Sequence, residues 1–236
     1  VLQAFFRGEG GGLAIADVET GLVNPSGRLP VSLPRSTGAQ PYSYLHPVLG
    51  GPSDVTSADS TPLRPFGFGL SYTDFAYDDL VVDPSVEAGG TFTAAVTVRN
   101  TGTVAGSHVV QLFGHDVQAT ITRPVVQLLG YTRVELDPGE AVRVTFLVPT
   151  TRFAFSDRRL VRVVEPGDVE VWVGAHAAAS GAGARTDEAT GGVIANEKAV
   201  ARRTLPGTAT DRAVLAVTGD VHRVSGADSR WVEVKL

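Results

Sequence analysis

The chain has 236 residues, a formal net charge of −5, and neither cysteine nor methionine. Without cysteine it can form no disulfide, no catalytic thiolate and no cysteine-bound zinc site. The mild acidity and the absence of a basic run argue against a nucleic-acid partner, and no apolar run approaches the roughly eighteen residues that cross a membrane. We therefore expect a soluble protein, and the compartment, cytoplasmic or secreted, stays open.

The first residues predict a chain that continues a fold begun elsewhere. The opening at 1–6 is apolar, lacks a starting methionine and has no signal-peptide pattern. A glycine-rich turn at 8–12 leads into a short helix over 13–18, which Gly21 ends. This turn is not a dinucleotide motif, because Leu13 stands where the third glycine of G-x-G-x-x-G belongs. No cofactor is predicted.

Residues 24–34 combine a turn with a short extended segment. Asn24-Pro25 and Ser26-Gly27 are turn formers, and Pro30 and Pro34 restrict the segment between them to the edge of a sheet. Physical chemistry alone assigns this stretch no reaction.

The next 23 residues or so, 40–62, read as one long loop with aromatic and acidic side chains. Rings stack on sugar faces and carboxylates accept from sugar hydroxyls, so the composition fits sugar binding. It fits equally an ordered surface loop that packs on its own tyrosines. The candidate contacts are Tyr42, Tyr44, His46, Asp54 and Asp59.

The stretch 65–73 marks the junction between two kinds of pattern. Gly67 and Gly69 alternate with Phe66 and Phe68, so the backbone can approach a neighbour closely while the rings supply buried area. We interpret this stretch as the wall of a domain interface, with direct ligand contact as the alternative.

After the junction, apolar residues recur at every second position, which indicates half-buried antiparallel strands. Turn sequences separate them at Asn100-Thr101-Gly102, Asp137-Pro138-Gly139 and Glu165-Pro166-Gly167. The expected strands cover 91–98, 108–113, 128–136, 142–148 and 169–173, then 213–217, 221–224 and 231–236. Such spacing is typical of a fibronectin- or immunoglobulin-like sandwich, with Trp172 as a core anchor. The Ala-, Gly- and Ser-rich stretch between the two groups predicts an insertion at 177–212.

Several ordered motifs resemble family 3 glycoside hydrolases, the β-glucosidase and β-xylosidase group. They include Asn24-Pro25-Ser26-Gly27-Arg28-Leu29-Pro30, the junction stretch, Val98-Arg99-Asn100-Thr101-Gly102 and Leu136-Asp137-Pro138-Gly139-Glu140. The likeness covers roughly residues 1–176, with departures at Arg7 and Gly10. It implies a mixed fold: the C-terminal remnant of an α/β sandwich domain at 1–75, then a fibronectin III-like antiparallel β-sandwich at 76–236.

The resemblance also implies that this chain contributes no catalytic residue. Family 3 enzymes carry their nucleophilic aspartate in a first, barrel domain and their acid/base glutamate upstream of the block matched here. We therefore predict no catalytic, cofactor-binding or metal-binding residue in this chain, and the five histidines show no metal-ligand spacing.

Two interpretations follow. In the first, the chain is the supporting C-terminal part of a retaining β-glycosidase that hydrolyses β-glucosides or β-xylosides. Its partners would be the barrel and α/β domains, and through them a β-linked sugar. In the second, it is a non-catalytic carbohydrate-binding or adhesive β-sandwich module whose N-terminal part is a docking arm.

Overall fold

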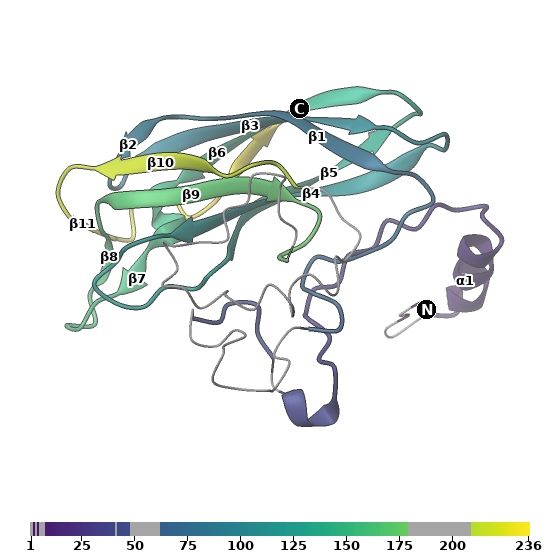
Figure 1. The fold of residues 1–236 in the computed structure, drawn as a ribbon, viewed down its shortest axis with the longest axis horizontal. Helices are drawn as coiled ribbons and strands as arrows, with labels where there is room; N and C mark the ends of the chain where they lie inside the picture. The colour runs from purple at the N-terminus through teal and green to yellow at the C-terminus, as the bar shows by residue number, and fades with distance from the viewer. Residues whose placement is uncertain (1, 3, 5–7, 41, 48–61, 179–208) are drawn as a thin grey trace, which may run out of the picture.

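The computed structural model describes residues 2, 4, 8–40, 42–47, 62–178 and 209–236. Most of these residues form a sandwich of two β-sheets, and the N-terminal part lies against one side of it (Figure 1). Asp54 and Asp59 lie outside the described residues, as does all but the two ends of the insertion predicted at 177–212.

The two large sheets are antiparallel apart from one pair. The four-stranded sheet has the order β1-β3-β6-β12, with bounds Phe75–Val82, Thr91–Asn100, Ala141–Pro149 and Glu233–Lys235. The five-stranded sheet has the order β2-β10-β9-β4-β5, with bounds Ser85–Glu87, Ala213–Thr218, Gly167–Gly174, Gly106–Asp116 and Gln127–Leu136. Strand β2 runs parallel to β10.

A third, small sheet lies at one end of the sandwich. Its order is β11-β8-β7, with bounds His222–Arg223, Arg162–Val164 and Phe155–Ser156. The short helix η3 (Thr150–Phe153) leads into it. The strand expected at 221–224 is therefore present, but its residues pair with β8 and not with either large sheet.

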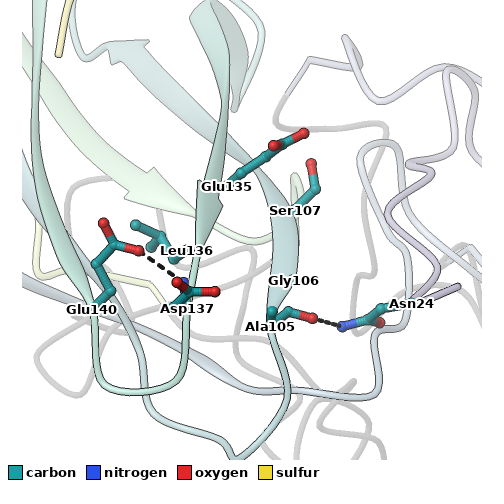
Figure 2. A pocket seen from close by; sticks show the side chains of 8 residues that line it. All are labelled: Asn24, Ala105, Gly106, Ser107, Glu135, Leu136, Asp137 and Glu140. Atoms are coloured by element: carbon teal, nitrogen blue, oxygen red, sulfur yellow. Dashed lines mark hydrogen bonds between the residues drawn. The ribbon is translucent and has the colours of Figure 1, made fainter.

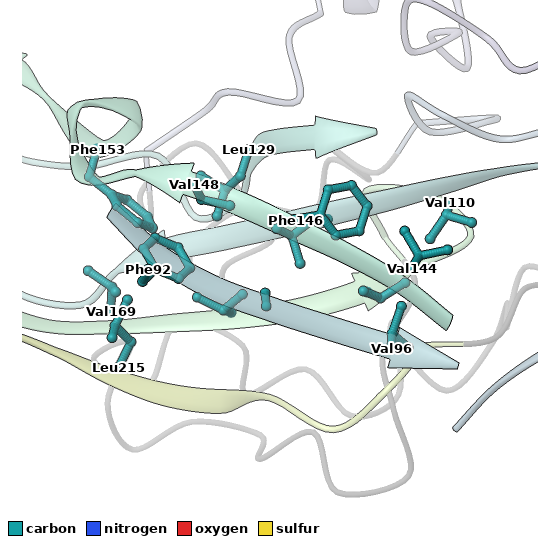
Figure 3. Packing of buried hydrophobic residues seen from close by; sticks show 14 of the residues in the cluster. Phe92, Val96, Val110, Leu129, Val144, Phe146, Val148, Phe153, Val169 and Leu215 are labelled. Atoms are coloured by element: carbon teal, nitrogen blue, oxygen red, sulfur yellow. The ribbon is translucent and has the colours of Figure 1, made fainter. Parts of the chain in front are cut away.

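The main core fills the space between the two large sheets. The inward positions of β3 and β6 alternate with outward ones, as the sequence predicts, and Phe92, Val96, Val144 and Phe146 are fully buried. Figure 3 shows these side chains meeting Val110, Val169 and Leu215 from the opposite sheet. With no disulfide available, burial of these apolar side chains holds the two sheets together.

A second cluster lies on the outer face of the five-stranded sheet. Its buried members are Phe113, Val126 and Trp172, and Tyr44 and Phe66 of the N-terminal part pack against them. Trp172 is thus buried, but it anchors this outer cluster instead of the inter-sheet core. The reason is strand alternation, because its neighbours Val171 and Val173 occupy the inward positions.

The N-terminal part contains little regular structure. Helix α1 (Gly11–Glu19) is slightly longer than the predicted 13–18, has no buried residue, and stands apart at the right of Figure 1. Besides it there is the single-turn helix η1 (Thr37–Ala39). The described helices include none that is long and apolar enough to span a membrane.

The edge strand expected between Pro30 and Pro34 is reduced to one bridge, between Leu33 and Arg64. Backbone hydrogen bonds do link this segment to the junction, from Leu29 N–H to Phe68 O and from Gly67 N–H to Leu29 O. The prolines supply no N–H, so the two segments cannot extend this pairing into a regular ladder.

Replacing Phe146 with alanine should lower the free energy of unfolding by about 3–5 kcal/mol, because the fully buried ring would leave a cavity between the sheets. Urea unfolding followed by circular dichroism measures this loss. The matched control is Tyr131→Ala on β5, where a ring that is 66% exposed should change the value by no more than about 0.5 kcal/mol. Equal effects would contradict the assignment of the core.

Candidate functional site: the docking interface of the N-terminal segment

We call the described residues up to 72 the N-terminal segment and residues 24–30 the docking motif. The docking motif lies where the N-terminal segment meets the end of the sandwich. Asn24 makes three hydrogen bonds there: its Nδ2 donates to Ala105 O at 3.0 Å, and its Oδ1 accepts from Ser71 Oγ at 2.9 Å and from Tyr72 N–H at 2.8 Å. One amide side chain thus ties the docking motif to both the junction and the sandwich.

The Asn24 contacts continue into the sandwich through the junction. Thr73 donates its hydroxyl to Asn100 Oδ1 at 2.6 Å, and Asn100 Nδ2 donates to Val104 O and Leu136 O. Asn100, the last residue of β3, is fully buried beside the turn that follows. A buried amide needs such partners, so this turn and the junction hold each other in place.

Arg28 reaches further, to a histidine at the end of the inter-sheet core. Its Nη2 lies 3.0 Å from His108 Nδ1, and His108 Nε2 lies 2.6 Å from the Tyr77 hydroxyl. A guanidinium can only donate, so Nδ1 accepts and the neutral imidazole carries its proton on Nε2. Burial, followed by the charge of Arg28, lowers the pKa of His108 to about 3. Burial also raises the pKa of Tyr77.

A third polar contact of the docking motif lies on the outer face of β5. Arg133 donates from Nη1 to Ser26 Oγ at 2.7 Å and to Ser107 Oγ at 3.0 Å. Asn24, Ser26 and Arg28 therefore all bind the sandwich or the junction, and each uses a different part of it.

The two junction glycines allow a close approach of backbones. Gly67 has φ +81°, and a Cβ there would lie 2.1 Å from Gln111 Oε1. The buried Gln111 donates from Nε2 to Gly67 O and Ala175 O. At Gly69 a Cβ would lie 2.1 Å from Gly27 O. Both positions thus favour glycine for the reason that the sequence suggests.

The aromatic residues of the junction pack in two different directions. Phe66 stacks on Tyr44, with ring centroids 4.3 Å apart. Phe68 is 7% exposed, with its ring 5.7 Å from that of His176 and under the guanidinium of Arg64. These contacts agree with a junction that forms the wall of an interface.

The structure brings three of the predicted sugar contacts together at 42–47. Tyr44 is engaged in packing, through Phe66 and through its hydroxyl, which accepts from Leu128 N–H at 3.4 Å. Tyr42 and His46 meet edge to face, with centroids 6.4 Å apart. The backbone beside them is held by the bond from Val125 N–H to His46 O.

A pocket of about 450 Å³ opens beside Asn24, between the start of β4 and the end of β5 (Figure 2). Its carboxylates, Glu135, Asp137 and Glu140, are all exposed. Glu140 Oε2 accepts from the backbone N–H of Asp137 and so closes the turn, while Glu135 points away from that turn. We assign this pocket no acid/base role, since Glu140 closes the turn and Glu135 points away from it.

The four histidines other than His46 are spread over the sandwich and not gathered in one place. His108 binds Arg28, His115 Nδ1 lies 2.9 Å from Pro124 O, and His222 Nε2 lies 3.0 Å from Asp228 Oδ1. In the part of the chain that the structure describes, no group of three His, Asp or Glu side chains is arranged to hold a metal ion.

The two parts of the chain match two known domain models. Residues 1–72 match the glycosyl hydrolase family 3 C-terminal domain, and residues 108–177 match the fibronectin type III-like domain. The chain carries the C-terminal and fibronectin type III-like domains of glycoside hydrolase family 3. The predicted family and fold class are therefore confirmed.

Curated relatives of these family 3 domains are named as β-glycosidases. The periplasmic beta-glucosidase of Salmonella typhimurium is 39% identical over 189 residues, which is 75% of this chain and 25% of that protein. The beta-xylosidase of Formosa agariphila is 40% identical over 179 residues, covering 74% of this chain and 25% of that protein. The chain thus spans about a quarter of the length of these relatives.

Solved structures agree with the curated relatives. A crystal structure of beta-glucosidase from Listeria innocua in complex with glucose superposes with a TM-score of 0.71 and 28% identity. The match covers 89% of this chain and 26% of that chain. It extends across both family 3 domains and therefore includes the interface between them.

Alanine at Gly69 should loosen the docking motif, because its Cβ would force the Gly27 carbonyl away from its present position. We expect the free energy of unfolding to fall by about 1–3 kcal/mol and tryptic cleavage after Arg28 to accelerate. The control is Gly27→Ala on the other side of the same contact, where a Cβ meets nothing within 4 Å. If both variants behave alike, the close approach does not stabilise the interface.

Proposed function

We propose that this chain acts as the supporting C-terminal part of a retaining β-glycosidase that cleaves β-glucosides or β-xylosides. The observation that carries the proposal is the family 3 C-terminal domain match at 1–72, joined to the sandwich by its own motif residues. The names of the β-glucosidase and β-xylosidase relatives support the substrate class. The boundary between the two parts belongs near residues 75 and 76, since β1 begins at Phe75.

The proposed contribution of the sandwich is mechanical. The N-terminal segment has no core of its own among its described residues: helix α1 buries nothing, and Leu13 and Leu22 are 70% and 78% exposed. Its position therefore depends on the contacts that Asn24, Ser26 and Arg28 make with the sandwich. It would also depend on a neighbouring domain that covers the exposed apolar side chains. We propose that the sandwich in this way fixes the position and orientation of a neighbouring catalytic domain.

The reaction requires two carboxyl groups on opposite sides of the glycosidic bond. In the proposed arrangement both are supplied by polypeptide outside this sequence, as are the barrel and α/β surfaces that bind the sugar. The segment 42–47 is the part of this chain that we place nearest to substrate. Tyr42 and His46 are its proposed contacts, and Tyr44, held by Phe66, would position them.

The isolated chain should not hydrolyse aryl β-glucosides or aryl β-xylosides, since it lacks the proposed nucleophile and acid/base. The protein extended upstream to include those domains should hydrolyse at least one of the two with retention of anomeric configuration. Release of the aryl alcohol, read by absorbance, and proton NMR of the first-formed sugar measure both outcomes. Turnover by the isolated chain would refute the proposal. Retention of the isolated chain on insoluble glucan or xylan would favour a binding module instead.

The isolated chain should also associate with itself, because the N-terminal segment exposes several large apolar side chains to water. Leu13, Leu22, Val23 and Leu70 are each at least 49% exposed, and patches of this kind promote association. Light scattering over a concentration series measures the effect, and Leu13→Glu with Leu22→Glu should reduce it. A chain that stays monomeric at all concentrations would contradict the prediction that these apolar side chains drive association.

A further inference from the structure

We propose that the contact between Arg28 and His108 is an acid-sensitive latch: protonation of the His108 imidazole releases the docking motif from a sandwich that stays folded. The inference concerns this chain by itself and does not rest on the proposed enzymatic role.

The position of His108 gives the first argument. The side chain occupies an inward position of β4, two residues before Val110, and is 4% exposed. Its ring stacks on Phe75 with centroids 4.3 Å apart. A protonated imidazole here would be a charge buried against an aromatic ring at the end of the core. Such a charge is costly unless a carboxylate accompanies it.

The groups that face His108 give the second argument. The docking motif contributes Arg28, strand β1 contributes the Tyr77 hydroxyl and the Phe75 ring, and β5 contributes Val134, which lies opposite His108 in register. Arg133, also on β5, adds a second positive charge beside Arg28. Burial and Arg28 are the two influences that lower the pKa of His108, and both oppose protonation.

Protonation also removes the hydrogen bond itself. In the neutral ring, Nδ1 accepts from Arg28 and Nε2–H points to Tyr77. In the cationic ring both nitrogens donate, so Nδ1–H would meet the Arg28 N–H groups at a donor–donor distance of 3.0 Å. Two like charges in contact would then push the docking motif outward.

The direction of the pH dependence follows from proton linkage. In the latched form the pKa of His108 is lowered to about 3. Release of the docking motif raises this pKa toward the ordinary value of about 6.5, because it removes the charge of Arg28 and opens that side of the ring to water. The released form therefore binds the proton more readily between these values. The latch is fully stable above about pH 6.5 and weakens as the pH falls toward 3, by up to about tenfold per pH unit for one linked proton.

The sandwich can stay folded when the latch opens, because different interactions stabilise the two. The docking motif is attached mainly by hydrogen bonds of Asn24, Ser26 and Arg28. Strands β3 and β6 are held to each other by nine residue pairs and to the opposite sheet by apolar inward side chains. Local opening of a polar attachment at lower free energy than global unfolding is the usual order in proteins.

Amide hydrogen exchange tests the latch between pH 7.5 and 4, with rates corrected for the intrinsic pH dependence of exchange. The reporters are the amides of Leu29 and Gly67, which bridge the docking motif and the junction, and the internal references are Val96 and Val144 in β3 and β6. We expect protection at the reporters to fall as the pH drops below about 6.5, by up to about tenfold per pH unit, while the references keep theirs. Nitrogen-15 NMR of the histidine rings should show His108 neutral, with Nε2 protonated, throughout the latched state.

Two variants separate the latch from general acid sensitivity. His108→Gln keeps an acceptor for Arg28 and cannot titrate, so its reporters should stay protected down to pH 4. The matched control is His222→Gln, a half-buried histidine paired with Asp228, which should behave as the unmodified chain. Should His108→Gln fail to fold, Arg28→Met provides the second test, with reporters that exchange freely at pH 7.5.

Three results would overturn the proposal. The first is an identical pH dependence in His108→Gln and the unmodified chain. The second is loss of protection at Val96 and Val144 in step with the reporters, which would mean global unfolding. The third is a free-titrating His108 ring with a midpoint near pH 6.5 while the reporters remain protected.

Discussion

A part-buried hydrogen bond from the Arg28 guanidinium to the neutral His108 ring joins the two parts of the chain at the end of the inter-sheet core. His108 closes the end of the inter-sheet core, where a polar nitrogen left without a partner costs about 1–3 kcal/mol. Arg28, which lies 80 positions before His108 in the sequence, supplies that partner. The docking motif therefore satisfies a polar atom at the end of the core, and it has its place because the sandwich offers an acceptor there.

The five-stranded sheet adds to this dependence because its strands β4 and β9 are buried on both faces around Phe113 and Trp172. Its inner face belongs to the main core and its outer face to the cluster around Trp172, to which the N-terminal segment contributes Tyr44 and Phe66. Strands β4 and β9 thus form a wall shared by the two parts. A displacement of the N-terminal segment would expose Phe113 and Trp172 to water, so apolar burial opposes what polar bonds alone would allow.

Local sequence patterns predict the strands well and the interface only in part. Alternation finds β3 and β6 because each has one face in the core, and the Phe-Gly-Phe-Gly pattern points to a close contact at the junction. What local patterns cannot supply is the partner: nothing near Arg28 in the sequence indicates His108. A weak signal does exist, since His108 stands at an inward position of a strand whose next inward residues are Val110 and Leu112.

Other differences have equally local causes. The prolines that mark an edge segment at 30–34 also remove the N–H groups that a regular strand would need, so one bridge remains. The size of Trp172 suggests a core anchor. Side chains alternate along a strand, however, and because Val171 and Val173 point into the inter-sheet core, Trp172 points to the outer face. Tyr44, one of the predicted sugar contacts, stacks its ring on Phe66 and accepts a hydrogen bond from Leu128 N–H, partners that its local sequence does not indicate.

The distribution of motif residues bears on what this part of the family does. Asn24, Arg28, Gly67 and Gly69 all make contacts between the N-terminal segment and the sandwich or junction, and none of them is a carboxylate. A hydrogen bond between polar groups fixes distance and direction more narrowly than apolar contact, because it weakens steeply with misalignment. An interface built from such bonds is suited to holding a neighbour in one orientation. That requirement fits the supporting role that we propose for this part of the family 3 fold.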